Sequence, residues 1–587
     1  MTERNKRGIW IGTLLAAATL LAVSGVQTLA DEPAAAGPTT SSDWPQWRGP
    51  TRDGVAGPGP KLADAWPDGG PKLLWKSGPI ACGLAADEGW GHEAHGGEEG
   101  GLGSVTVAGD RAFVYVHWKR KGAAVVITTK DLEKFGWMEG VPDDLGMKVD
   151  EEAKKHNGFH RKPDEKLDVF LKDFQASLDP KLVEKFGPWI DKRITLLWKG
   201  HPTEVKYWGE LSRISDLRDK EFATYKELSQ AITKRGGFNF YGSQEFADHL
   251  NTMGNAYTDT VVCLDVSTGK EIWKKEFPGA PSTEMLYFGA SGTPAVWDGK
   301  CYASGSAGLY CLSVNDGSVV WQAKTSFTHS SPLVANGGVF LMLGEGLIGF
   351  DAKTGQLLWK QPKIRNRASS VVSWAGGNKI YLMATDRGGA SCVDPSDGKV
   401  VWRCPYNGGD GNGTPVICGD IMVDPNSNMR AIRLTDEKGE QLWAKPQGSA
   451  NDGQTALIYQ GHIYQASPRY SGWVRCRDLK TGDFKWLANW GCQCTSTIAA
   501  DGKIFFVHTF GSRKPRLMMF NANPEKFELL GVGSATDAVP EGCTPSIANG
   551  KLYVRLADCV ACYDITAAGN PVVTPPKLPV FEVKYPQ

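Results

Sequence analysis

The sequence predicts an all-β fold: an eight-bladed β-propeller of four-stranded antiparallel blades, with a mainly helical insertion in the first blade. Three observations predict it. Short apolar strands recur along most of the chain, each repeat contains a hairpin that ends in tryptophan, and the repeats keep a nearly constant length. That length is typical of one four-stranded blade. The 587 residues therefore need not divide into several domains.

The repeats consist of a strand, a tight turn and a second strand that ends in tryptophan. Four clear copies and two weaker ones end at Trp273, Trp321, Trp359, Trp402, Trp443 and Trp486. Consecutive tryptophans are 38 to 48 residues apart, and a TG or DG pair usually precedes them, as in CLDVSTGKEIW. Glycine at such a turn tolerates the positive φ that a tight hairpin requires. Each repeat therefore predicts the outer hairpin of one blade.

The two ends of the repeat region predict how the ring closes. The last repeat, TPSIANGKLYVRLADCVACYD, stops after three strands. The segment KLLW, which ends at Trp75, has the pattern of an outer strand but no repeat before it. Pairing Trp75 with the sheet formed by residues 550–564 completes the last blade and removes an open sheet edge. This closure gives eight blades.

Between Trp75 and Trp273 the chain holds about 155 residues more than one repeat requires. After the strand around Trp118, apolar residues recur at three- and four-residue steps with mixed charges between them. This pattern predicts amphipathic helices, and we place a helical insertion at residues 128–257. Its position within the blade predicts helices on the face that carries the loops into the inner strands. They either cap the funnel or extend the blade sideways.

The first residues have the pattern of a secretory signal. Arg4, Lys6 and Arg7 precede an apolar run and a small-residue cleavage site at Ala30. We therefore expect a signal peptide at residues 1–30, a flexible linker at 31–43, the propeller at 44–566 and a C-terminal tail at 567–587. After cleavage the chain is expected to be periplasmic or secreted, with no transmembrane domain. An uncleaved signal would instead tether it to the membrane.

Charge and cysteine usage limit the classes of partner and site. Lys+Arg and Asp+Glu both number 65, so the net charge is zero and no long-range field attracts a polyanion. We therefore expect no nucleic-acid partner. Four of the 13 cysteines, Cys263, Cys311, Cys392 and Cys476, precede a repeat tryptophan by ten residues. A small residue there is typical of a packed sheet interior, so we interpret these four as core thiols.

The motif of alanine or cysteine, Asp, TG and Trp, as in CLDVSTGKEIW, resembles the PQQ-repeat (pyrroloquinoline quinone-like) β-propeller family over roughly residues 44–566. The opening DWPQWRGPTRDGV resembles the start of exported, BamB-like bacterial propellers related to the lipoprotein of the outer-membrane β-barrel assembly machine. These resemblances imply either a binding module in the cell envelope or a quinoprotein dehydrogenase. Likeness of fold does not choose between them.

Loops expected on one face of the ring carry polar and aromatic side chains from different blades. Two cations among several carboxylates can hold an anionic ligand, such as a quinone tricarboxylate, or a metal ion. The candidate cofactor-binding residues are Glu284, His329, Arg365, Arg367, Asp410, Asn451, Asp452, Trp490, Asp537 and Glu541. The alternative is that these loops are polar only because they are solvated.

A second candidate is a metal site in the segment GHEAHGGEE. His92, Glu93 and His95 supply imidazole and carboxylate groups that can bind zinc or another first-row metal. The segment lacks the helix that makes a His-Glu-x-x-His motif specific, so a flexible polar loop is the alternative.

The sequence contains no nucleophile elbow, phosphate-binding loop or dinucleotide fingerprint. The catalytic residues of quinoprotein dehydrogenases have no residue-by-residue match in it. We therefore predict a non-catalytic module that binds an envelope protein or a small ligand on the loop-bearing face, and we assign no catalytic residue. The alternative is a PQQ- and calcium-dependent oxidoreductase of alcohols or sugars. Metal-assisted hydrolysis at the His92 loop is a third hypothesis.

Overall fold

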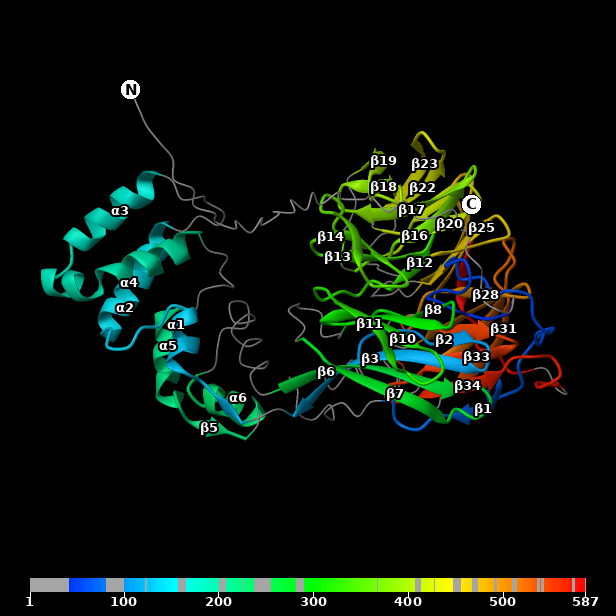
Figure 1. Cartoon of the computed structure of the whole chain (residues 1–587), viewed down its shortest axis with the longest axis horizontal. Helices are drawn as coiled ribbons and strands as arrows, with labels where there is room; N and C mark the ends of the chain where they lie inside the picture. Colours follow the sequence, from blue (N-terminus) through cyan, green and yellow to red (C-terminus); the bar gives the residue numbers. More distant parts are fainter. Residues whose placement is uncertain are drawn as a thin grey trace, which may run out of the picture.

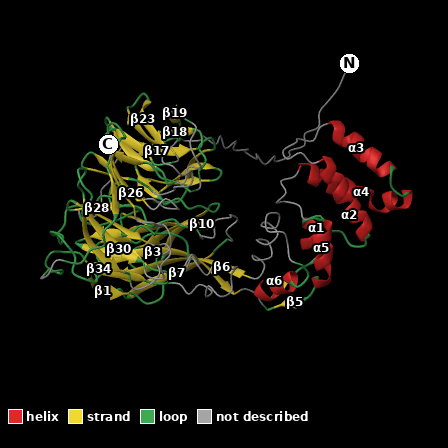
Figure 2. Ribbon diagram, turned by 180° about the vertical axis from the view of Figure 1, so that it is seen from behind, coloured by secondary structure: helices red, strands yellow, loops and turns green. Residues whose placement is uncertain are grey.

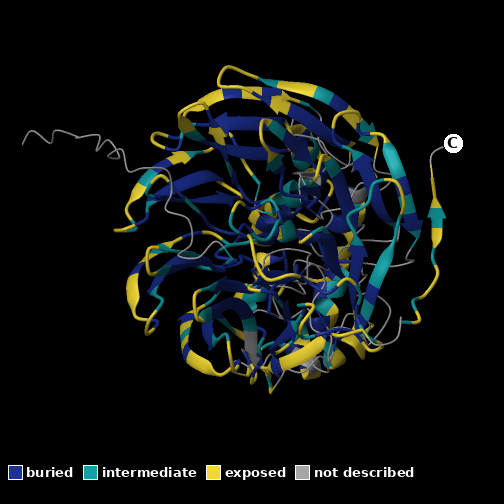
Figure 3. Ribbon diagram, turned by 90° about the vertical axis from the view of Figure 1, so that its right-hand side faces the viewer, coloured by how far each residue is buried: buried dark blue, intermediate teal, exposed yellow. Residues whose placement is uncertain are grey.

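The computed structural model contains a ring of eight antiparallel sheets, seven of four strands and one of five, together with a group of helices (Figures 1 and 2). The predicted eight-bladed propeller is confirmed. Buried residues lie within the blades and exposed ones at the rim (Figure 3). The structure describes residues 42–80, 100–121, 124–156, 165–199, 207–223, 225–236, 255–280, 290–366, 368–406, 413–426, 428–446, 455–466, 473–489, 494–508, 515–535, 539, 543–572 and 576–585.

Each blade runs from an inner strand beside the ring axis to an outer strand at the rim. Blades 1 to 4 are β2 (Thr106–Ala108), β3 (Arg111–Lys121), β6 (Asn255–Asp265) and β7 (Glu271–Pro278); β8 (Ala295–Trp297), β9 (Lys300–Ser304), β10 (Gly308–Ser313) and β11 (Val319–Lys324); β12 (Leu333–Ala335), β13 (Gly338–Leu343), β14 (Gly346–Asp351) and β15 (Leu357–Gln361); and β16 (Val372–Gly376), β17 (Lys379–Asp386), β18 (Gly389–Val393) and β19 (Val400–Pro405).

The second half of the ring repeats this order, and blades 6 and 8 each include a strand from one end of the chain. Blades 5 to 8 are β20 (Val416–Cys418), β21 (Ile421–Asp424), β22 (Asn428–Leu434) and β23 (Gly439–Pro446); β24 (Leu457–Tyr459), β25 (His462–Ala466), β26 (Trp473–Asp478), β27 (Phe484–Asn489) and β35 (Glu582–Lys584); β28 (Ile498–Ala500), β29 (Lys503–His508), β30 (Arg516–Asn521) and β31 (Leu529–Ser534); and β32 (Ser546–Ala548), β33 (Lys551–Arg555), β34 (Val560–Asp564) and β1 (Lys72–Lys76).

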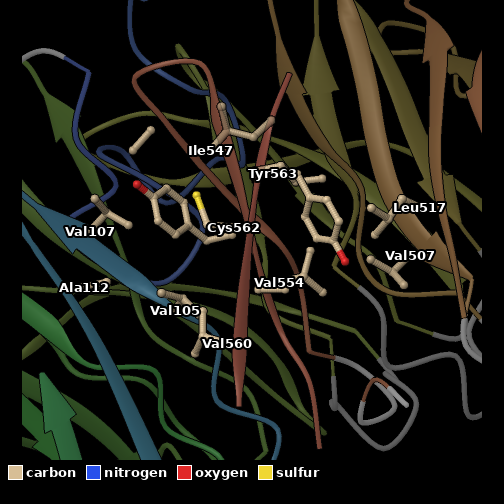
Figure 4. Packing of buried hydrophobic residues seen from close by; sticks show 14 of the residues in the cluster. Val105, Val107, Ala112, Val507, Leu517, Ile547, Val554, Val560, Cys562 and Tyr563 are labelled. Atoms are coloured by element: carbon tan, nitrogen blue, oxygen red, sulfur yellow. The ribbon is translucent and has the colours of Figure 1, made fainter. Parts of the chain in front are cut away.

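The predicted ring closure is confirmed. β1 pairs antiparallel with β34, and Trp75 lies opposite Cys562. The last blade therefore takes three strands from the end of the repeat region and its outer strand from the beginning. Figure 4 shows its packing: Tyr563 points toward Val507 and Leu517 of blade 7, whereas Cys562 points to the side on which Val107 of blade 1 lies.

A small residue lies opposite each repeat tryptophan on the neighbouring strand. Cys263 pairs with Trp273, and Cys311, Cys392 and Cys476 pair with their own tryptophans in the same way. All four thiols are buried, and burial raises the pKa of each to about 12. Thiols that stay protonated are poor nucleophiles and poor metal ligands. The prediction that these four cysteines belong to the core is confirmed.

Each repeat tryptophan also fastens its blade to the next one. Seven indole Nε1 atoms, from Trp75 to Trp486, donate to a backbone carbonyl in the outer turn of the following blade at 2.7 to 3.0 Å. The turn glycine lies under the indole ring. At Gly355, which has a φ of +72°, an added Cβ would lie 2.5 Å from Trp321. The glycine thus provides both the turn conformation and room for the ring.

The insertion of blade 1 connects β3 to β6 and forms its own core. It contains α1 (Thr129–Lys134), α2 (Asp143–His156), α3 (Glu165–Ala176), α4 (Pro180–Lys199), α5 (Trp208–Ile214), the 3-10 helix η2 (Ser215–Leu217), α6 (Tyr225–Thr233), β4 (Val125–Val126) and β5 (Glu221–Phe222). A buried ion pair joins Arg193 to Asp150, with Nε to Oδ1 at 2.6 Å. No hydrophobic cluster of described residues includes both these helices and a blade.

The insertion leaves the blade from the ends of β3 and β6, and its helices lie beyond those ends (Figures 1 and 2). Thr128 caps α1, the first helix of the insertion. The predicted end at residue 257 falls within β6, because β3 and β6 pair along their whole length, from Arg111↔Asp265 to Lys121↔Asn255. Among the described residues, no helix is both long and apolar enough to cross a membrane.

A matched pair of glycine substitutions tests the tryptophan contact. Gly355 and Gly299 have nearly the same φ, +72° and +69°, but nothing lies within 4 Å of an added Cβ at Gly299. Either change to alanine costs about 1 kcal/mol from the left-handed backbone. Gly355→Ala should cost about 1 to 3 kcal/mol more, because Trp321 must move. Urea unfolding of both variants measures the difference, and equal losses would contradict the contact.

Candidate binding face and the closed central channel

The order of strands within a blade defines the two faces of the ring. In every blade the inner strand begins, and the second strand ends, on one face, because neighbouring strands are antiparallel. We call this the loop face; the outer turns with their glycines lie on the opposite face. The insertion leaves blade 1 from the loop face, as the sequence predicted.

Two of the predicted cofactor-binding residues lie within the described part of the chain. His329 is partly buried, and its Nδ1 lies 3.1 Å from the Ser291 hydroxyl. Arg365 is exposed and donates through Nε to the Pro362 carbonyl at 2.7 Å. The other predicted positions lie outside the described residues: Glu284, Arg367, Asp410, Asn451, Asp452, Trp490, Asp537, Glu541, His92, Glu93 and His95.

The described residues do not by themselves form a site that fits a quinone with calcium. Nowhere in the described ranges do three or more His, Cys, Asp or Glu side chains gather closely enough to hold a metal ion. His329 and Arg365 have separate hydrogen-bond partners, as given above. No catalytic step through such a cofactor follows from this geometry.

A polar cluster that sequence patterns did not predict joins blades 1 and 2 near the loop face. The Asp259 carboxylate is fully buried and accepts hydrogen bonds from the hydroxyls of Tyr115 (2.6 Å), Tyr310 (2.8 Å) and Ser306 (2.8 Å). The backbone amides of Ser306 and Ala307 donate to it as well. Such complete pairing stabilises a buried carboxylate. Asp259 therefore holds the two blades together.

His117 lies beside this cluster, directly opposite Asp259 on the neighbouring strand. Its side chain is buried, and its ring stacks on Tyr257 at 5.6 Å between centroids. The Ala290 amide donates to Nδ1 at 3.0 Å, so the neutral ring carries its proton on Nε2. Nε2 has no partner among the described residues. A buried imidazole in this state is a hydrogen-bond donor rather than a metal ligand.

Two further buried carboxylates on the loop face also bond to side chains within the fold. Asp424, at the end of β21, accepts from the Tyr406 hydroxyl at 2.5 Å, and the Arg430 guanidinium lies 4.3 Å from the Tyr406 ring centroid. Burial raises the pKa of Asp424. Asp386, at the end of β17, forms an ion pair with Arg403. These carboxylates stabilise the ends of strands and do not form a metal site.

Residues 44–56, here called the axial segment, cross the central channel. Trp44 pairs with Val107 of blade 1, and the Val296 amide of blade 2 donates to the Pro45 carbonyl at 2.7 Å. At its other end, the Ala56 amide donates to the Ala499 carbonyl of blade 7 at 2.8 Å. This short segment thus contacts blades 1 and 2 at one end and blade 7 at the other.

Two arginines of the axial segment extend this crossing. Arg52 donates to the carbonyls of Pro332 (2.8 Å) and Ser331 (3.2 Å), at the start of blade 3. Arg48 donates to Thr497 of blade 7 (3.0 Å) and Ala456 of blade 6 (2.8 Å). Blades 3 and 7 face each other across a ring of eight, so the two guanidiniums span the channel.

Burial makes both guanidiniums more acidic than an arginine in water. Desolvation lowers the pKa of Arg48 to about 10 and that of Arg52 to about 9, so both remain charged at neutral pH. Their Nε–H groups have no partner among the described residues. The axis of the ring is therefore positively charged and filled by the chain itself.

The repeats, the tryptophan contacts and the ring closure define the class of fold, an eight-bladed β-propeller, and the repeats are similar to those of the PQQ type. Residues 257–486 match the family model described as outer membrane protein assembly factor BamB. The chain is 26% identical to BamB of Moranella endobia over 292 residues, which cover 46% of this chain and 73% of that protein.

Two enzymes are also similar in sequence. Tetrathionate hydrolase of Acidithiobacillus ferrooxidans is 28% identical over 30% of this chain, and polyvinylalcohol dehydrogenase of a Sphingopyxis species is 20% identical over 51%. The chain spans 40% and 56% of their respective lengths. Among solved structures, BamB of Moraxella catarrhalis matches with a TM-score of 0.41 and 15% identity, over 52% of this chain and 88% of that one.

Replacing Arg52 tests the axial segment. Arg52→Met removes two donors and leaves the Ser331 and Pro332 carbonyls unpaired, which should cost about 2 kcal/mol of unfolding free energy. Arg52→Lys keeps the charge but replaces the planar, two-pronged guanidinium with a single ammonium nitrogen, so it should recover only part of the loss. Urea unfolding measures both. Wild-type midpoints for both variants would show that the guanidinium does not hold the segment.

The buried state of His117 predicts a pH dependence of stability. Burial lowers the pKa of His117 below 6.5. As the pH falls through that value, the unfolded chain therefore binds a proton at this histidine more readily than the folded chain does. Stability should therefore decrease from about pH 7 to about pH 5, and less so in His117→Gln. Urea midpoints at both pH values measure this, with His462→Gln as the control. An unchanged pH dependence in His117→Gln would rule out this contribution.

Proposed function

We propose that this chain is an envelope propeller of the BamB type that uses its loop face to bind another protein or a small ligand. The observation that carries the proposal is the closed channel: Arg48, Arg52 and the rest of the axial segment occupy the ring axis. The buried carboxylates near the loop face are engaged in internal bonds. The part of the molecule that is left for binding is the surface of loops that the rigid ring carries.

The proposed location is the periplasm or the outside of the cell. Two observations support it: the signal-like pattern of Arg4, Lys6, Arg7 and the apolar run after them, and the match of residues 257–486 to BamB. The proposed partner is an envelope protein, by analogy with relatives that are named as assembly factors of the outer membrane.

A quinoprotein oxidoreductase is the second candidate, and the similarity to polyvinylalcohol dehydrogenase favours it. In this alternative PQQ and calcium would be bound on the loop face by the predicted residues, most of which lie outside the described part of the chain. The quinone would supply the oxidising chemistry.

A photoreactive amino acid at one position on each face tests the binding proposal. Arg365 is exposed on the loop face, and Gln356 is exposed beside an outer turn on the opposite face. In cells that express either variant, the label at 365 should form a discrete adduct with an envelope protein, whereas the label at 356 should not. Equal labelling from both positions, or none from either, would contradict a binding site on the loop face.

Titration with PQQ and calcium separates the two candidates. The scaffold proposal predicts no saturable binding of the quinone and no dye-linked oxidation of alcohols or sugars by the purified mature chain. Saturable binding with turnover that is lost in Arg365→Ala would establish the oxidoreductase instead. Stoichiometric zinc in the untreated protein that His92→Ala removes would support the third hypothesis, a metal-dependent hydrolase.

A further inference from the structure

The eight outer strands differ in how they protect their exposed edges. Lysine and arginine on an edge strand discourage pairing with another chain. In blades 1 to 5 and blade 8 a charged residue follows the repeat tryptophan, namely Lys274, Lys324, Lys360, Arg403, Lys445 and Lys76. In blade 6 the residues after Trp486 are Leu487, Ala488 and Asn489, and β31 of blade 7 has no charged residue.

Both of these edges are covered by segments from the ends of the chain, and the one charged residue of β27, Lys485, lies before Trp486. Residues 66–71 lie along β31: the Trp66 amide donates to the Leu530 carbonyl, and added Cβ atoms at Gly531 and Gly533 would collide with Trp66 and Pro71. β35 covers blade 6. The structure thus covers the two edges that have no charged residue after the position of the repeat tryptophan.

The cover on blade 6 is a strand pairing. β35 lies antiparallel to β27, in the register Leu487↔Lys584, Ala488↔Val583 and Asn489↔Glu582. Phe581 and Val583 pack on the hydrophobic cluster that contains Trp486 and Ala488. The Lys584 ammonium lies 5.0 Å from the Trp473 ring centroid. Figure 3 shows this strand at the periphery of the ring.

This cover is a small and local contact. Three residue pairs hold it, Phe581 and Val583 are only partly buried, and Val580 next to them is 97% exposed. The four strands of blade 6 are complete without β35. The C-terminal strand can therefore separate from the edge at a free-energy cost far below that of unfolding the ring.

We propose that the outer edge of blade 6 is a strand-acceptor site, and that a second copy of the chain pairs with it, β27 against β27, when the C-terminal strand is lifted. Charge selects this occupant. The edges of blades 1 to 5 on another copy would bring lysine or arginine onto residues 487–489, whereas a second β27, whose one charge is Lys485 before Trp486, brings Leu487, Ala488 and Asn489. Antiparallel pairing of two identical strands generates a two-fold axis and a closed dimer.

The test uses added charge to detach β35 from blade 6 in the full-length chain. Phe581→Asp/Val583→Asp places two carboxylates against the apolar cluster and should release β35. Val580→Asp/Tyr585→Asp adds the same charge at exposed positions and should leave it bound. Sedimentation velocity should show a concentration-dependent dimer for the first variant and a monomer for the wild type and the second. Near-ultraviolet circular dichroism reports whether each ring is folded.

A third substitution locates the interface. Leu487→Lys, added to the release variant, gives blade 6 the charged edge that Lys360 gives blade 3, and it should return the dimer to monomer. In the dimer, hydrogen exchange should protect the amides of residues 487–489. A folded release variant that stays monomeric, or one whose association persists with Leu487→Lys, would overturn the proposal.

Discussion

The contact between a tryptophan and the turn of the next blade is the interaction on which the whole ring depends. Seven indoles donate to a carbonyl of the neighbouring turn, and six of them lie over its glycine, so these blades are fastened to the blade that follows them. Trp75 makes the same contact with Val266 in blade 1. The seven contacts run from blade 8 through blades 1 to 6 to blade 7, and β31 of blade 7 has no tryptophan for the junction with blade 8. The pairing of β1, which carries Trp75, with β34 completes the last blade.

The N-terminal residues 44–76 have three structural roles in succession. Residues 44–56 fill the axis, residues 66–71 cover the edge of blade 7, and residues 72–76 complete blade 8. Their partners are backbone groups in blades far away along the chain, such as Ser331 and Thr497. Such long-range contacts form only after large loops have closed. The ring is therefore completed and closed along its axis by the same short piece of chain.

The features that could be predicted from the sequence are those with a local and repeated signal. The spacing of the tryptophans gave the blades, the missing fourth strand gave the closure, and Cys263 and its equivalents were placed in the core. The axial segment was not foreseen, because Arg48 and Arg52 bind carbonyl groups, which every residue possesses. The Asp259 cluster and β35 depend on side chains that meet only in the folded ring. Of the predicted site, only His329 and Arg365 lie in the described residues.

The buried titratable groups near the loop face are bonded within the fold. A general base needs a carboxylate or imidazole with an open lone pair near the substrate. Asp259 uses both oxygens within the fold, Asp424 is hydrogen-bonded to Tyr406, and His117 presents a proton rather than a lone pair. Arg48 and Arg52 add buried positive charge without a reactive atom. Asp259, Asp424 and His117 are therefore engaged within the fold, and the ring serves as a rigid support for the loops that it carries.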